Sequence, residues 1–135
     1  MYSGFKDLNV WKLGMEIVED VYNLSKRLPM EEKYGIVSQM KRAAVSIPSN
    51  IAEGHSRNYN KVFIQFLRTS LGSVSELNTL ILLTVNLKMI NKTEIVLLED
   101  KIDHISKMIS KLIFNKESEL KLNQGFEKRE TKNDN

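Results

Sequence analysis

Four basic side chains in the middle of the chain are of the types that bind nucleic-acid phosphates: Lys41, Arg57, Lys61 and Arg68. Proteins that bind single strands combine such cations with aromatic rings on which bases stack, and Tyr59 lies among these residues in the sequence. Residues 33–68 carry six basic side chains against one acid, Glu53, although the net charge of the chain is only +3. This asymmetry is typical of an anion-binding face, and equally of an ordinary solvated surface.

A second group of polar residues lies in RAAVSIPSNIAEG, residues 42–54. On a helix, one face would carry Arg42, Ser46, Ser49, Asn50 and Glu53. In a structural interpretation these residues form a buried or interfacial network that sets the register of helices or subunits. In a functional one, Arg42, Asn50 and Glu53 bind a substrate or nucleic acid. Because this face lies beside an apolar stripe, we favour the structural interpretation and predict an interface.

Catalytic chemistry has little support in the sequence. The two histidines, His55 and His104, are 49 positions apart, and the chain contains no cysteine. Neither histidine has a second metal ligand at a typical spacing, and there is no glycine-rich phosphate loop or nucleophile elbow. We therefore predict no catalytic residue, no metal site, no cofactor and no enzymatic activity.

Hydrophobic periodicity predicts that helices position all of these residues. The first predicted helix lies between Asp7, its N-cap, and Pro29, and it has two apolar stripes. One stripe consists of Leu8, Trp11, Met15, Val18 and Tyr22, and the other of Val10, Ile17, Val21, Leu24 and Leu28. A second helix is predicted from about Glu31 and a third after the turn at 54–60. The fourth follows Asn91 with Thr93 as its cap, and its apolar residues repeat as a heptad: Ile95, Leu98, Ile102, Ile105, Ile109 and Leu112.

Pro48 lies inside the second predicted helix. A proline removes one helical hydrogen bond and costs about 3 kcal/mol in a helix interior. Because Ile47 and Ile51 stay in phase with the apolar residues before them, we predict a bend rather than a break, with Ser46 or Ser49 bonded to a freed carbonyl. Small residues of the third helix, Ser70, Gly72, Ser73 and Ser75, would let another backbone approach closely.

Long helices joined by short loops predict an all-α, antiparallel up-and-down four-helix bundle over residues 1–114. Residues 115–135 are polar and predict a disordered tail, with a helical extension through Leu120 and Leu122 as the alternative. The lack of cysteine, and the lack of a secretory-signal profile in residues 1–12, favour a cytoplasmic location. No apolar run is long enough to span a membrane.

Several segments, in this order and at natural spacing, resemble the signature of a bacterial family: KDLNVW (6–11), PMEEKYG (29–35), QMKRAA (39–44), SIPSNIAEG (46–54), Arg57 and GS-x-x-E-L (72–77). These are the four-helix-bundle proteins encoded in intervening sequences of 23S ribosomal RNA genes. The resemblance spans residues 5–114 and implies assembly into cyclic homopentamers. It also implies that Arg42, Ser46, Pro48, Asn50, Glu53 and Gly54 are family positions, without giving them a role.

A related branch, the accessory proteins of diversity-generating retroelements, binds nucleic acid and a reverse transcriptase. That branch is strongly basic, and the net charge of +3 departs from it. Two functional hypotheses follow. In the first, a homo-oligomer binds RNA or DNA through a basic surface repeated around a ring. In the second, the ring is a protein-interaction scaffold with no role in nucleic-acid binding.

Overall fold

The computed structural model describes residues 4–133, and the side chains of residues 4–130. Within this range all regular structure is helical. The elements are, in order, η1 (Phe5–Asp7), α1 (Asn9–Ser25), η2 (Met30–Glu32), α2 (Ile36–Ser56), α3 (Asn60–Asn86), η3 (Lys92–Ile95) and α4 (Val96–Asn133). The four α-helices confirm the predicted all-α fold class.

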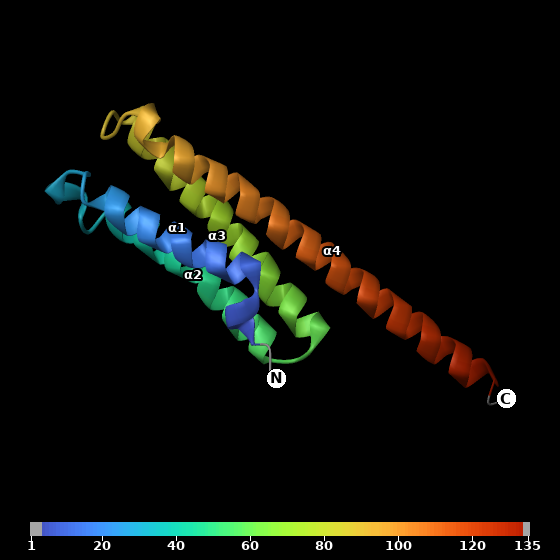
Figure 1. Ribbon diagram of the computed structural model, residues 1–135. Helices are drawn as coiled ribbons and strands as arrows, with labels where there is room; N and C mark the ends of the chain where they lie inside the picture. Colours follow the sequence, from blue (N-terminus) through green and yellow to red (C-terminus); the bar gives the residue numbers. More distant parts are fainter. Residues whose placement is uncertain (1–3, 134–135) are drawn as a thin grey trace.

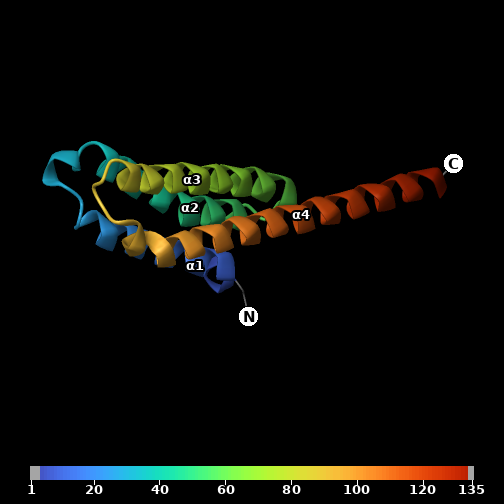
Figure 2. The same cartoon turned by 90° about the horizontal axis from the view of Figure 1, so that it is seen from above.

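The helices form an up-and-down bundle in which successive helices run in opposite directions (Figure 1). Each helix packs on its neighbour in the sequence, and α4 also packs on α1. α4 is the longest helix and projects beyond the bundle, past the end at which α2 turns into α3 (Figure 2).

The core consists of the apolar faces that the periodicity predicts. Side chains with no exposed surface come from every helix: Ile17, Val21, Met40, Ile47, Ile51, Leu67, Leu77, Ile81, Ile105 and Ile109. Burial of such a side chain stabilises the fold by about 1.5–3 kcal/mol. Of the two stripes predicted for α1, the one with Ile17 and Val21 is buried. The other keeps Met15 and Tyr22 42% and 43% exposed.

Two glycines let α2 pack closely between α1 and α3. α2 continues unbroken through Pro48, which is buried against Gly14 of α1. A Cβ atom on Gly14 would lie 3.3 Å from the Cβ atom of Pro48. Near the end of α2, Gly54 lies under two phenylalanines of α3, and a Cβ atom there would lie 2.5 Å from the Cβ atom of Phe66. No larger residue fits at Gly54 without a shift of one helix.

Small polar side chains connect α2 to α3. The buried Ser70 hydroxyl donates a hydrogen bond to the carbonyl of Ile47, 2.9 Å away. The hydroxyls of Ser46 and Ser73 are 2.8 Å apart, and the Asn50 amide donates to the Ser46 hydroxyl at 2.8 Å. Among the described residues, neither Ser46 nor Ser49 bonds a carbonyl with its hydroxyl, in contrast to the prediction. The carbonyl that Ser70 bonds is that of Ile47, and not the Ala44 carbonyl that Pro48 frees.

The starts of three helices differ from the prediction. α2 begins at Ile36, after the 3-10 turn η2, and not near Glu31. η3 precedes α4, and its N-cap is Asn91, whose backbone N–H donates to the Glu94 carboxylate at 3.0 Å. Thr93 lies inside this turn and does not cap α4. Asp7 ends a short 3-10 turn, and α1 begins at Asn9. In all three places a 3-10 turn comes before the α-helix, and apolar periodicity does not reveal such turns.

The structure also differs from the disordered tail predicted for 115–135, because α4 continues as helix to Asn133. This stretch contains no proline, and its first residues contact α3: Arg68 forms an ion pair with Glu117, and the Asn60 amide donates to Glu119 at 2.7 Å. Packing against the core reaches Leu120, whereas residues 121–130 are all exposed. The alternative of a helical extension is therefore the one that the structure shows. Residues 134–135 lie outside the described range.

Candidate functional site

The four cations predicted to bind nucleic acid do not form one cluster. Arg57 lies at the C-terminal end of α2, Lys61 is in the first turn of α3, and Arg68 follows about two turns later. Lys41 lies sixteen residues before Arg57, and α2 connects them, so a rise of about 24 Å separates their backbones. Lys41 therefore belongs to a different part of the surface.

Two of the three cations at the α2–α3 turn are paired with acids. Arg57 forms an ion pair with Glu53 at 3.1 Å, and Arg68 forms one with Glu117. Lys61 is exposed. The Arg57 pair was visible in the sequence as an i, i+4 spacing, but the partner of Arg68 is 49 residues away and could not be anticipated. These acids reduce the positive potential at this end of the bundle.

The predicted interface residues separate into two groups. Four of them, Ser46, Pro48, Asn50 and Gly54, lie in the contacts of α2 with α1 or α3 described above. The interface that they form is therefore one between helices of the same chain. Arg42 and Glu53, by contrast, are exposed and do not form part of a buried network.

A groove beside α2 gathers three cations and two aromatic rings. Tyr22 of α1, Lys33 and Tyr34 of the α1–α2 connection, and Lys41 and Arg42 of α2 line it, together with Ser38, Val45 and Ser46. None of these lining residues is acidic. Unlike Arg57 and Arg68, none of the three cations forms an ion pair with another described residue. We call this site the α1–α2 groove.

Each tyrosine in the α1–α2 groove lies next to a lysine. The Lys41 ammonium is 4.7 Å from the centre of the Tyr22 ring, and the Lys33 ammonium is 5.6 Å from that of Tyr34. Both distances are within the range of cation–π attraction. Tyr34 is 89% exposed, and Tyr22 belongs to the stripe of α1 that the core leaves uncovered. The contact of Tyr22 with Lys41 could not be predicted from the sequence, because the two residues lie on different helices, α1 and α2, and meet only where these helices pack.

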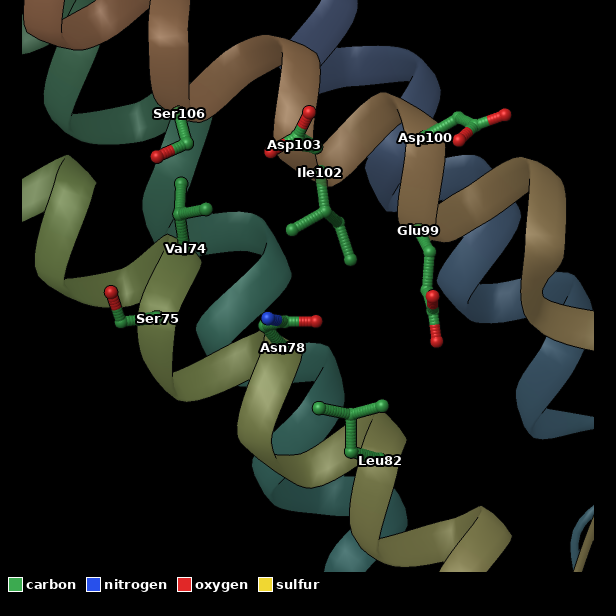
Figure 3. A pocket seen from close by; sticks show the side chains of 9 residues that line it. All are labelled: Val74, Ser75, Asn78, Leu82, Glu99, Asp100, Ile102, Asp103 and Ser106. Atoms are coloured by element: carbon green, nitrogen blue, oxygen red, sulfur yellow. The ribbon is translucent and has the colours of Figure 1, made fainter. Parts of the chain in front are cut away.

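A second groove, of about 400 Å³, lies between α3 and α4 (Figure 3). Glu99, Asp100 and Asp103 of α4 line it together with Ser75, Asn78 and Leu82 of α3. In Figure 3 the side chains of Asn78 and Glu99 extend into the space between the two helices, while Asp100 points away from it. One carboxylate oxygen of Glu99 is buried without a hydrogen-bond partner. Nothing among the described residues forms a group of His, Cys, Asp and Glu suited to a metal ion.

Neither histidine belongs to a group of three or more metal-ligating side chains among the described residues. His55 lies in the last turn of α2, its ring packs edge-on against Phe63 with the ring centres 5.5 Å apart, and its Nδ1 atom is buried without a hydrogen-bond partner. His104 is exposed on α4.

One lysine is held by a charge network. Lys101 of α4 is 2.8 Å from the Asp20 carboxylate and 3.7 Å from that of Glu16, both on α1. The hydrogen bond to Asp20 raises the pKa of Lys101 above its ordinary value, and partial desolvation opposes this effect. The ammonium is thus charged at neutral pH and ties α4 to α1. Because the folded-state pKa is raised, this contribution to stability is lost only as the pH rises through that pKa.

Comparisons with known proteins agree with this architecture. The family model described as 23S rRNA-intervening sequence protein matches residues 6–111. Among solved structures, a protein of unknown function from the S23 ribosomal protein family of Bacteroides thetaiotaomicron has a TM-score of 0.71 to this chain, at 24% sequence identity. The match covers 77% of this chain and 97% of that one, and it shows a shared fold. No curated protein matches the chain. No helix among residues 4–133 is long and apolar enough to cross a membrane.

Proposed function

We propose that this chain, which belongs to the 23S rRNA-intervening sequence protein family, is a non-enzymatic protein that binds RNA or DNA through the α1–α2 groove. The observation that supports this proposal most directly is that Lys33, Lys41 and Arg42 line one groove and that none of the other lining residues is acidic. Nucleic-acid backbones bind to such cations by releasing condensed counterions. The groove therefore replaces the α2–α3 turn as the surface that we assign to phosphate binding.

We also propose that the protein assembles as a homo-oligomer, in the ring of five that the family resemblance implies, through the outward face of α3. Gly72 in the middle of α3 costs about 1 kcal/mol against alanine, yet a Cβ atom there would meet nothing within 4 Å in its own chain. Thr79 and Leu83 continue the same exposed face, which also carries Glu76. Small residues beside an exposed leucine suit close packing against a second subunit.

Replacement of Gly72 with lysine tests this assembly. Since lysine has a higher helix propensity than glycine and the site is open, the variant should fold with unchanged or slightly higher stability. At a subunit interface the same side chain would insert an unpaired charge. We expect Gly72→Lys to convert the oligomer into monomers in light scattering coupled to size exclusion. A wild-type protein that is already monomeric, or an unchanged oligomer in the variant, would contradict the assignment of this face.

Fluorescence anisotropy of the wild-type protein tests nucleic-acid binding. The probe is a labelled RNA that contains both helices and unpaired loops, titrated at low and at near-physiological salt. We expect binding at low salt that weakens steeply as salt is added. If each of the three cations in one copy contacts one phosphate of a single strand, the slope of log K against log salt is about −2. The slope is steeper if several copies in an assembly contact the same strand.

Absence of binding at low salt would remove the proposal. The groove would then be better explained as a docking site for a protein, and a partner recovered in pulldowns that survive nuclease treatment would favour the scaffold hypothesis. Repetition of a groove around a ring would strengthen weak contacts with either class of partner.

A further inference from the structure

We infer that the α1–α2 groove binds an unpaired segment of nucleic acid, with bases stacked on Tyr22 and Tyr34 and phosphates held by the neighbouring lysines. This inference rests on the proposed function and specifies its substrate class. The groove contains aromatic rings as well as cations. Two of its lining residues are tyrosines that leave much of their rings in solvent, 43% of the surface of Tyr22 and 89% of that of Tyr34.

The position of the two rings argues for a ligand with flat faces. Tyr22 comes from α1 and Tyr34 from the connection to α2, and the groove brings the two together although they are separated in the sequence. An exposed aromatic ring gains little from the fold itself, because it forgoes most of the stabilisation that burial would give it. Stacking against a nucleobase would cover the exposed ring surface.

The lysines determine which flat ligand fits. The ammonium groups of Lys41 and Lys33 lie 4.7 Å and 5.6 Å from the ring centres. A base stacked on either ring would carry its phosphate on a short sugar linkage, within reach of a flexible lysine side chain. Alternation of rings and cations along a groove is the arrangement by which proteins bind single strands. In a duplex the bases already stack on one another, so the tyrosines would gain nothing from it.

The experiment compares an unstructured single-stranded RNA of about 15 nucleotides with the duplex that it forms with its complement. Both are titrated into the wild-type protein, into Tyr22→Leu/Tyr34→Leu, and into the ring-preserving control Tyr22→Phe/Tyr34→Phe. The leucine variant should lose affinity for the single strand by about tenfold per ring and keep its affinity for the duplex. The phenylalanine variant should bind both ligands as the wild type does. Thermal unfolding of all three proteins confirms that they fold.

The outcomes separate the two levels of the proposal. If the wild type binds the duplex as well as the single strand and the leucine variant binds like the wild type, the stacking inference is wrong and phosphate binding stands. If the wild type binds neither RNA at low salt, the proposed function itself fails. If poly-glutamate competes with the single strand fully and the leucine variant is unaffected, the groove recognises acidic polymers by charge alone, which also overturns the inference.

Discussion

Gly54→Ala is expected to lower the free energy of unfolding by about 2 kcal/mol, although alanine is the better helix former. The reason is the contact between α2 and α3. The new Cβ atom would lie 2.5 Å from the Cβ atom of Phe66 and 3.1 Å from atoms of both Phe63 and Phe66. Because the Cβ atom of Phe66 is attached directly to the α3 backbone, no change of rotamer can move it away, and the two helices must separate.

Thermal and urea unfolding measure this effect. A loss of about 2 kcal/mol corresponds to a decrease in Tm of roughly 5–10 °C for a chain of this size. Gly125→Ala is the matched control, because Gly125 also lies in a helix and a Cβ atom there meets nothing within 4 Å. The control should unfold at or slightly above the wild-type Tm. Equal stability of the two variants would show that α2 and α3 do not pack as closely as described.

Lys41→Glu/Arg42→Glu is expected to weaken RNA binding by about 50-fold or more at 50 mM salt. Counterion release makes each phosphate contact with a single strand worth about tenfold at this salt concentration, and two contacts are removed. The two acids would also repel the phosphates that remain near Lys33. Both native side chains lie at the surface without ion-pair partners among the described residues, so the fold should tolerate the change.

The control for this variant has the same net charge as the groove variant, but its two substitutions lie outside the α1–α2 groove. Lys12→Glu/Lys61→Glu also lowers the net charge from +3 to −1, since each replacement changes it by two. Lys12 and Lys61 are exposed outside the α1–α2 groove, and Lys61 belongs to the cluster that the sequence alone predicts. We expect a loss of less than about fivefold, due to general repulsion. A larger loss in the control than in the groove variant would restore the α2–α3 turn as the binding surface.

The helices could be predicted because their buried residues recur every three or four positions along the sequence. The heptad residues predicted from Ile95, at the end of η3, to Ile109 of α4 recur every three or four positions, and all of them are buried. The same periodicity predicts that the second helix continues past Pro48, and α2 does so, because the apolar residues on both sides of the proline face one core. Such repeats depend only on local helix geometry, which the sequence contains in full.

The site was less predictable because it depends on contacts between distant segments. The sequence offers Arg68 no acidic partner nearby, because Glu117 lies in the part of α4 for which the composition of residues 115–135 predicts a disordered tail. Polar composition predicts disorder where no neighbouring helix supplies partners, and α3 supplies them for Glu117 and Glu119. Lys41 was identified, but its tyrosine partner lies on another helix. The sequence predicts an interface over residues 42–54, and Ser46, Pro48, Asn50 and Gly54 form one, between α2 and its neighbours α1 and α3, whereas Arg42 and Glu53 stay exposed.

The measurement that tests the central claim most directly is the salt dependence of single-stranded RNA binding by the wild type and by Lys41→Glu/Arg42→Glu. Each phosphate contact contributes about 0.7 to the slope of log K against log salt, so the slope counts the contacts that the groove makes. We predict that the slope of the variant is shallower by about 1.4 per copy that contacts the strand, while Lys12→Glu/Lys61→Glu keeps the wild-type slope. Identical slopes for all three proteins would contradict the claim that this groove holds the phosphates.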